Sequence, residues 1–80
     1  MNAGYIVASI IKDKLNSMGY WAVVSWLASK IGSYFAKLIV SRVVAVGVYG
    51  AASYIAYLMG VSSAIAGPLA AIAGVVGGWL

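Results

Sequence analysis

The chain has 80 residues, of which 65% are hydrophobic, with five basic residues and one acidic residue. It contains no cysteine and no histidine, which excludes disulfides and catalysis or metal binding by those side chains. The single carboxylate, Asp13, cannot by itself build a cation site or an acid/base pair. We therefore expect a protein that is not an enzyme and has no cofactor, although bound membrane lipid is expected.

The same composition argues against an ordinary soluble domain. A typical soluble domain is about 25% charged, whereas this chain is 8% charged and has a mean hydropathy of +1.06. Small domains have a large surface for their volume, so the apolar excess is expected to face lipid, other copies of the chain, or both. The net charge of +4 favours anionic partners such as lipid head groups or nucleic acid.

Residues 3–18 are expected to form an amphipathic helix, because their polar and apolar side chains recur at helical spacing. The polar face holds Ser9, Lys12, Asp13, Asn16 and Ser17, and the apolar face holds Ile6, Val7, Ile10, Ile11, Leu15 and Met18. Gly19 favours a stop after this helix. A helix of this kind can lie in a membrane interface or pack on neighbouring subunits.

Residues 20–59 are expected to form one long helix or a broken one. Residues 20–41 predict a helix of about 33 Å, long enough to span a bilayer core, and no breaker separates it from the apolar run 43–59. The first part carries a narrow polar stripe, made of Ser29, Lys30, Ser33, Lys37 and Ser41. Lysines at mid-span would require a head group, a water-filled lumen or a polar partner.

The C-terminal part predicts a hydrophobic helical hairpin. No charged residue follows Arg42. Residues 60–63 are the expected turn, and residues 64–80 the last apolar helix, with Pro68 near its start where proline is tolerated. Abundant alanine and the lack of period-2 alternation favour helix over strand. We therefore expect an all-α single domain over residues 1–80, an amphipathic helix followed by a hairpin.

Small residues recur at four-residue spacing, which allows helix backbones to approach closely. The three stripes are Gly47 and Ala51; Ala52, Ala56 and Gly60; and Ala66, Ala70, Gly74 and Gly78. They predict tight packing either between subunits or within one hairpin, and the sequence leaves both readings open.

The basic residues are candidates for contact with phosphate, from lipid head groups or from DNA. They are Lys12, Lys14, Lys30, Lys37 and Arg42. The alternative is simple solvation of an exposed face. No motif for reading nucleic-acid sequence is present, so DNA is expected only as cargo that is not bound sequence-specifically.

The hairpin resembles the major pilin of conjugative and type IV secretion pili, including the archaeal DNA-import pilins. The likeness rests on an apolar helix, then Gly60-Val61-Ser62-Ser63, then a second helix containing Ala73-Gly74-Val75-Val76-Gly77-Gly78. It implies a helical filament of self-associating, lipid-bound subunits in the membrane and the extracellular pilus. It also implies membrane secretion or import machinery as a partner, DNA transfer between cells as the function, and a turn facing the lumen. The family turn typically carries a basic residue, and this chain has Val61 there.

A second resemblance points to a different function. The opening half, with Lys12 and Lys14 before Gly19 and an apolar helix to Gly32, is similar to circular bacteriocins. These are cationic helical proteins with joined termini that permeabilise target membranes. The likeness implies growth inhibition of sensitive cells and, for a joined chain, a mass lower by one water. A small pore-former such as a holin is a third alternative.

Overall fold

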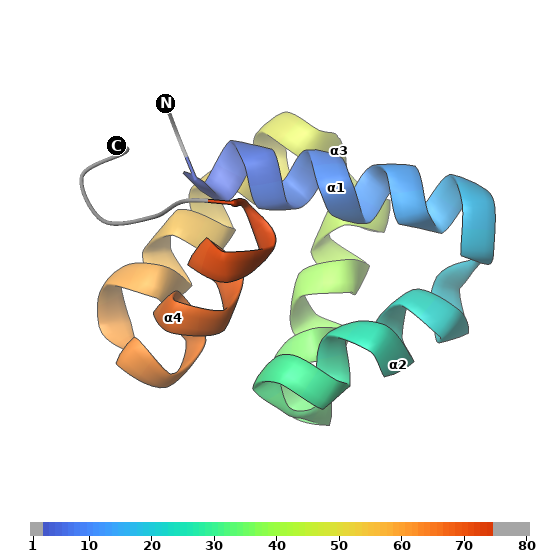
Figure 1. The fold of residues 1–80 in the computed structure, drawn as a ribbon. Helices are drawn as coiled ribbons and strands as arrows, with labels where there is room; N and C mark the ends of the chain where they lie inside the picture. The colour runs from blue at the N-terminus through green and yellow to red at the C-terminus, as the bar shows by residue number, and fades with distance from the viewer. Residues whose placement is uncertain (1–2, 75–80) are drawn as a thin grey trace.

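The computed structural model describes residues 3–74, and within this range the chain is helical with no strand. The helices are α1 (Ala3–Met18), α2 (Tyr20–Ile31), α3 (Ser33–Val61) and α4 (Ser63–Ile72) (Figure 1). The all-α prediction is confirmed, and the first helix has the predicted bounds. Helix α1 lies across the others and makes its most extensive contact with α3.

Glycines separate the first three helices. Gly19 and Gly32 adopt φ values of 87° and 88°, which glycine reaches without the steric cost of a Cβ atom. The prediction of one helix over residues 20–41 is therefore wrong in its end point: the helix stops before Gly32, and Ser41-Arg42 lies within α3. The polar stripe is divided between two helices, although every one of its residues is exposed.

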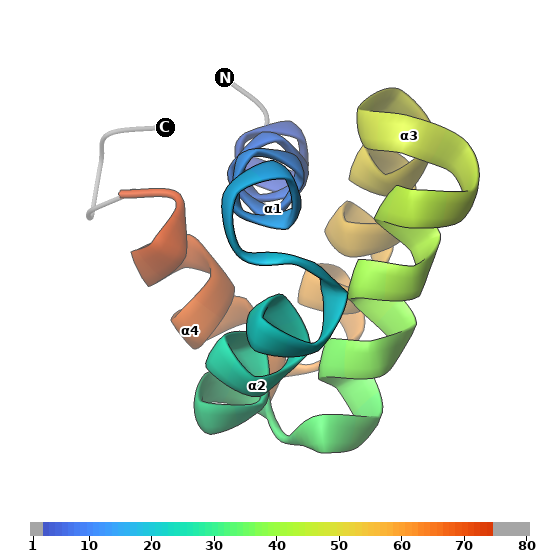
Figure 2. The same cartoon turned by 90° about the vertical axis from the view of Figure 1, so that its right-hand side faces the viewer.

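Helix α3 is interrupted in its middle at Gly47. This residue has φ 79° and ψ −178°, outside the helical region, and the two parts of α3 change direction there (Figure 2). The change brings the Arg42 guanidinium to 4.2 Å from the centre of the Tyr54 ring. In a straight helix, Cα atoms twelve residues apart would be about 18 Å apart. Residues 20–59 therefore contain two breaks, at Gly32 and Gly47.

The turn between α3 and α4 falls within the predicted residues 60–63. It is narrower than expected, because Gly60 and Val61 end α3 and only Ser62 has extended backbone, with φ −143° and ψ 117°. Helix α4 ends at Ile72, so the predicted helix over 64–80 is wrong for residues 73–74, where Gly74 turns the chain with φ 74°. Residues 75–80 lie outside the described residues. Pro68 lies inside α4, beyond its first turn.

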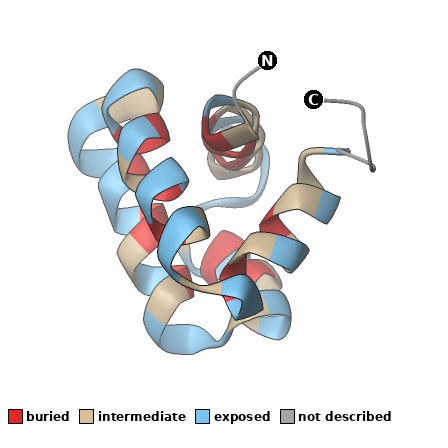
Figure 3. Cartoon of the chain, turned by 90° about the vertical axis from the view of Figure 1, so that its left-hand side faces the viewer, coloured by how far each residue is buried: buried red, intermediate tan, exposed pale blue. Residues whose placement is uncertain are grey.

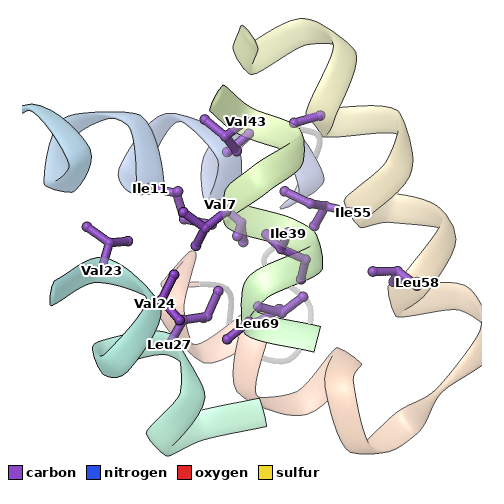
Figure 4. Close-up of a cluster of buried hydrophobic side chains, with 14 of the residues drawn as sticks. Val7, Ile11, Val23, Val24, Leu27, Ile39, Val43, Ile55, Leu58 and Leu69 are labelled. Atoms are coloured by element: carbon purple, nitrogen blue, oxygen red, sulfur yellow. The ribbon is translucent and has the colours of Figure 1, made fainter. Parts of the chain in front are cut away.

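The core is apolar and draws on every helix. Its members recur at helical spacing, which turns one stripe of each helix inward (Figures 3 and 4). They are Val7, Ala8, Ile11, Val23, Val24, Leu27, Ala36, Ile39, Val40, Val43, Ala51, Ala52, Ile55, Leu58, Ile65 and Leu69. Among residues 3–74 no polar or charged side chain is buried, so hydrophobic burial is the main stabilising contribution.

The chain covers this core without a second copy. Its accessible surface is 4346 Å², close to the value of about 4,500 Å² expected for a folded monomer of its mass. Its radius of gyration is 11.3 Å, against about 11.6 Å for a compact chain of this length. The expected apolar excess remains at the surface, where large hydrophobic side chains such as Trp21 and Tyr34 are exposed.

Helix α3 is, by length and composition, the one helix within the described range that could cross a membrane. Only 33% of its most apolar window is buried in the bundle. The break at Gly47 divides it into halves of roughly 20 Å, shorter than a bilayer core of about 30 Å. In the observed conformation neither half is long enough to span a bilayer core.

Candidate functional site

An open groove of about 500 Å³ lies where α1, α2 and α4 meet. We call it the Trp26 groove. Its lining residues are Ile10, Lys14, Trp26, Lys30, Pro68, Ala71 and Ile72. The volume is within the range of about 300–1,000 Å³ that is typical of small-molecule sites.

Helical spacing explains why these side chains converge. Residues four apart lie on one helix face, so α1 turns Ile10 and Lys14 toward the groove and α2 turns Trp26 and Lys30 toward it. Both helices thus supply one apolar side chain and one ammonium group. Helix α4 supplies only apolar groups, and no lining residue is acidic.

The Trp26 ring is the common partner of the two lysines. The Lys14 Nζ atom lies 4.6 Å from a Trp26 ring centroid, and the Lys30 Nζ atom lies 5.5 Å from one. Both distances are in the range of cation–π attraction. The Ser29 hydroxyl donates a hydrogen bond to the Trp26 carbonyl oxygen over 2.7 Å. The half-buried indole therefore holds two cations at the groove.

The five basic residues predicted to contact phosphate do not form one cluster. Lys14 and Lys30 share the groove, Arg42 lies over Tyr54, and Lys12 and Lys37 are exposed outside the groove lining. Sequence reasoning missed that Lys14 and Lys30 share the Trp26 indole. The spacing of Trp26 and Lys30 on one helix was the available signal, but the contribution of α1 and α4 depends on tertiary packing.

The three small-residue stripes contain both buried and exposed residues. Ala51 and Ala52 are buried within the chain's own core, which matches the reading of packing within one chain. Ala56, Gly60 and Gly74 are exposed, and Gly47, Ala66 and Ala70 are half-buried. Gly78 lies outside the described residues. In the predicted lumen-facing turn, Gly60, Val61 and Ser63 are exposed and Ser62 is half-buried.

A second surface feature surrounds the break in α3. Val44, Val46 and Tyr49 are 61%, 52% and 79% exposed, and the ring of Tyr5 lies 5.3 Å from that of Tyr49. We call these four residues the kink patch. A hydrogen bond with Tyr5, together with Coulombic interaction and slight desolvation, raises the pKa of Tyr49. The kink patch contains no lysine, arginine, aspartate or glutamate side chain.

Comparison of the chain with protein-family models, with curated proteins and with solved structures finds no match. The function is therefore inferred from the groove, the kink patch and the fold that holds them.

Proposed function

We propose that this protein is a cationic helical bundle that binds anionic membranes from the aqueous phase and permeabilises them. The observation that carries the proposal is a self-covered fold with an exposed apolar kink patch. The core side chains are buried by the chain's own helices, so filament formation is not required to bury the core. Such a molecule can reach a membrane as a single particle.

The net charge, the exposed apolar side chains and the break in α3 support three successive steps of membrane permeabilisation. The net charge of +4 attracts the chain to a surface of anionic head groups. Val44, Val46 and Tyr49 then offer exposed apolar and aromatic groups for the interfacial region. The break at Gly47 supplies the third step, because straightening α3 there would produce the one described helix that is long and apolar enough to cross the bilayer.

Leakage from dye-loaded vesicles tests this proposal. Vesicles that contain phosphatidylglycerol are expected to release dye, and vesicles of phosphatidylcholine alone are expected to release much less. Added salt should reduce the difference, because it screens the attraction between exposed charges. Failure to release dye from either vesicle, or equal release from both, would contradict the proposal. Growth inhibition of bacterial cells is the corresponding cellular measurement.

A pilin-like subunit is the second candidate function, and the exposed small residues favour it. The second part of α3 meets α4 at Ser62, with Ala56 and Gly60 exposed beside the turn. These residues would let a second copy approach closely. In this candidate function the chain is a subunit of a lipid-containing extracellular pilus. A secretion or import machinery in the membrane is its partner, and DNA is the cargo.

Negative-stain electron microscopy of native material separates the two candidates. Filaments that retain lipid would support the pilin-like candidate, and single small particles would support the membrane-active bundle. Gly60→Leu is a suitable interface variant, because a Cβ added at Gly60 meets no atom within 4 Å. Gly74→Leu would confuse interface loss with backbone strain, since Gly74 has φ 74°.

A further inference from the structure

We propose that the Trp26 groove binds one anionic phospholipid, with its phosphate between Lys14 and Lys30 and its acyl chain along α4. This inference rests on the proposed function, because it names the lipid that the membrane-active bundle recognises. It adds a defined site to general attraction between opposite charges.

The position of the two ammonium groups supplies the first argument. Both lie over rings of one indole, at 4.6 and 5.5 Å from the centroids, so both ammonium groups flank the same side chain although they belong to different helices. A phosphodiester carries a negative charge and can accept hydrogen bonds from both. No acidic side chain lines the groove to neutralise them, so an anion is the complementary ligand.

The rest of the lining supplies the second argument. Ile10 of α1 and Pro68 and Ile72 of α4 give the groove an apolar wall beside the lysines. A free phosphate ion would leave this wall in water, whereas an acyl chain attached to the phosphate would cover it. The groove therefore matches an amphiphilic anion better than a small inorganic one.

The Trp26 ring also argues for a particular head group. Aromatic faces attract quaternary ammonium groups such as choline. Here the indole already interacts with Lys14 and Lys30, and a third cation would be repelled by them. The site should therefore prefer phosphatidylglycerol, which carries a net negative charge, over phosphatidylcholine.

Calorimetric titration of the full chain with dihexanoyl phosphatidylglycerol, below its micelle concentration, tests the site. We expect saturable binding of one lipid per chain. The double variant Lys14→Gln/Lys30→Gln should weaken binding by about tenfold or more, since it removes both charged donors. The matched control Lys12→Gln/Lys37→Gln removes the same charge outside the groove lining and should bind within about threefold of the unmodified chain.

A third variant tests the site without removing either lysine. Ala71 is exposed and lines the groove on α4, so Ala71→Glu should leave the fold intact and place a carboxylate beside the expected acyl chain. We expect this variant to lose lipid binding. Retained binding would contradict the proposed course of the acyl chain along α4.

Three further results would overturn the site. These are equal weakening by the two double variants, equal binding of inorganic phosphate, and equal binding of dihexanoyl phosphatidylcholine. Dye release separates this failure from failure of the proposed function. Release without selective lipid binding would reject the groove alone, whereas selective binding without release would support the groove and reject permeabilisation.

Discussion

The Arg42 guanidinium lies 4.2 Å from the centre of the Tyr54 ring, on the far side of the break at Gly47. The two residues belong to different parts of α3, and only the change in direction brings them together. Contact between a guanidinium and an aromatic face is attractive. We infer that this pair helps to hold α3 in its folded-back conformation.

A double-mutant cycle measures this pair. Arg42→Gln and Tyr54→Leu should show a coupling free energy of about 0.5–1 kcal/mol, the usual range for a partly exposed cation–π contact. The measurement is chemical denaturation of both single variants and the double variant. Lys37→Gln is the control, since Lys37 is exposed on the same helix, and its effect should stay within about 0.5 kcal/mol. Additive effects of Arg42→Gln and Tyr54→Leu would show that the contact is not stabilising.

The glycine at the break should be sensitive to any side chain. Gly47 has φ 79° and ψ −178°, a conformation that is strained for other residues, so Gly47→Ala should lower the free energy of unfolding by about 1–3 kcal/mol. Gly60→Ala is the matched control, because Gly60 is helical and exposed. It should raise stability by about 0.5–1 kcal/mol.

A steric clash cannot explain the expected difference in stability between Gly47→Ala and Gly60→Ala, since an added Cβ meets no atom within 4 Å at either glycine. Thermal denaturation of the two variants measures it. A Gly47→Ala variant at least as stable as Gly60→Ala would show that the chain does not need a positive φ at residue 47.

The core of the second part of α3 gives a third prediction. Ile55 is completely buried, so Ile55→Ala should cost about 2–5 kcal/mol through lost burial and the remaining cavity. Val61→Ala, at the exposed end of the same helix, should change stability by less than about 0.5 kcal/mol. A small effect at Ile55 in urea denaturation would mean that this part of α3 does not belong to the cooperative core.

Sequence patterns predicted the helices better than their breaks. The periodicity of residues 3–18 gave α1 its observed bounds, because local spacing determines which face is apolar. Gly32 and Gly47 could not be told apart from Gly50 or Gly60, which lie in α3 with helical backbone. A glycine permits a positive φ without requiring it, so the residue type alone does not decide between the two conformations.

Sequence patterns also could not predict how the residues of the Trp26 groove come together. The basic residues were identified by type, and their grouping was not predictable. Lys14 and Lys30 share one indole because α1 packs against α2. Trp26 is the shared partner of two cations in the structure, a role that residue type and helical spacing do not reveal.

The last prediction concerns the kink patch and uses two valines with the same exposure. Val44 and Val61 are each 61% exposed and both lie on α3, so Val44→Ser and Val61→Ser remove similar apolar area at different places. Neither change should alter the free energy of unfolding by more than about 0.5 kcal/mol. If the kink patch is the surface that enters the membrane interface, Val44→Ser should slow dye release from phosphatidylglycerol vesicles by severalfold and Val61→Ser should have little effect. Equal slowing of dye release by both variants would contradict a special role for the residues around Gly47. It would indicate instead that general surface hydrophobicity drives membrane binding.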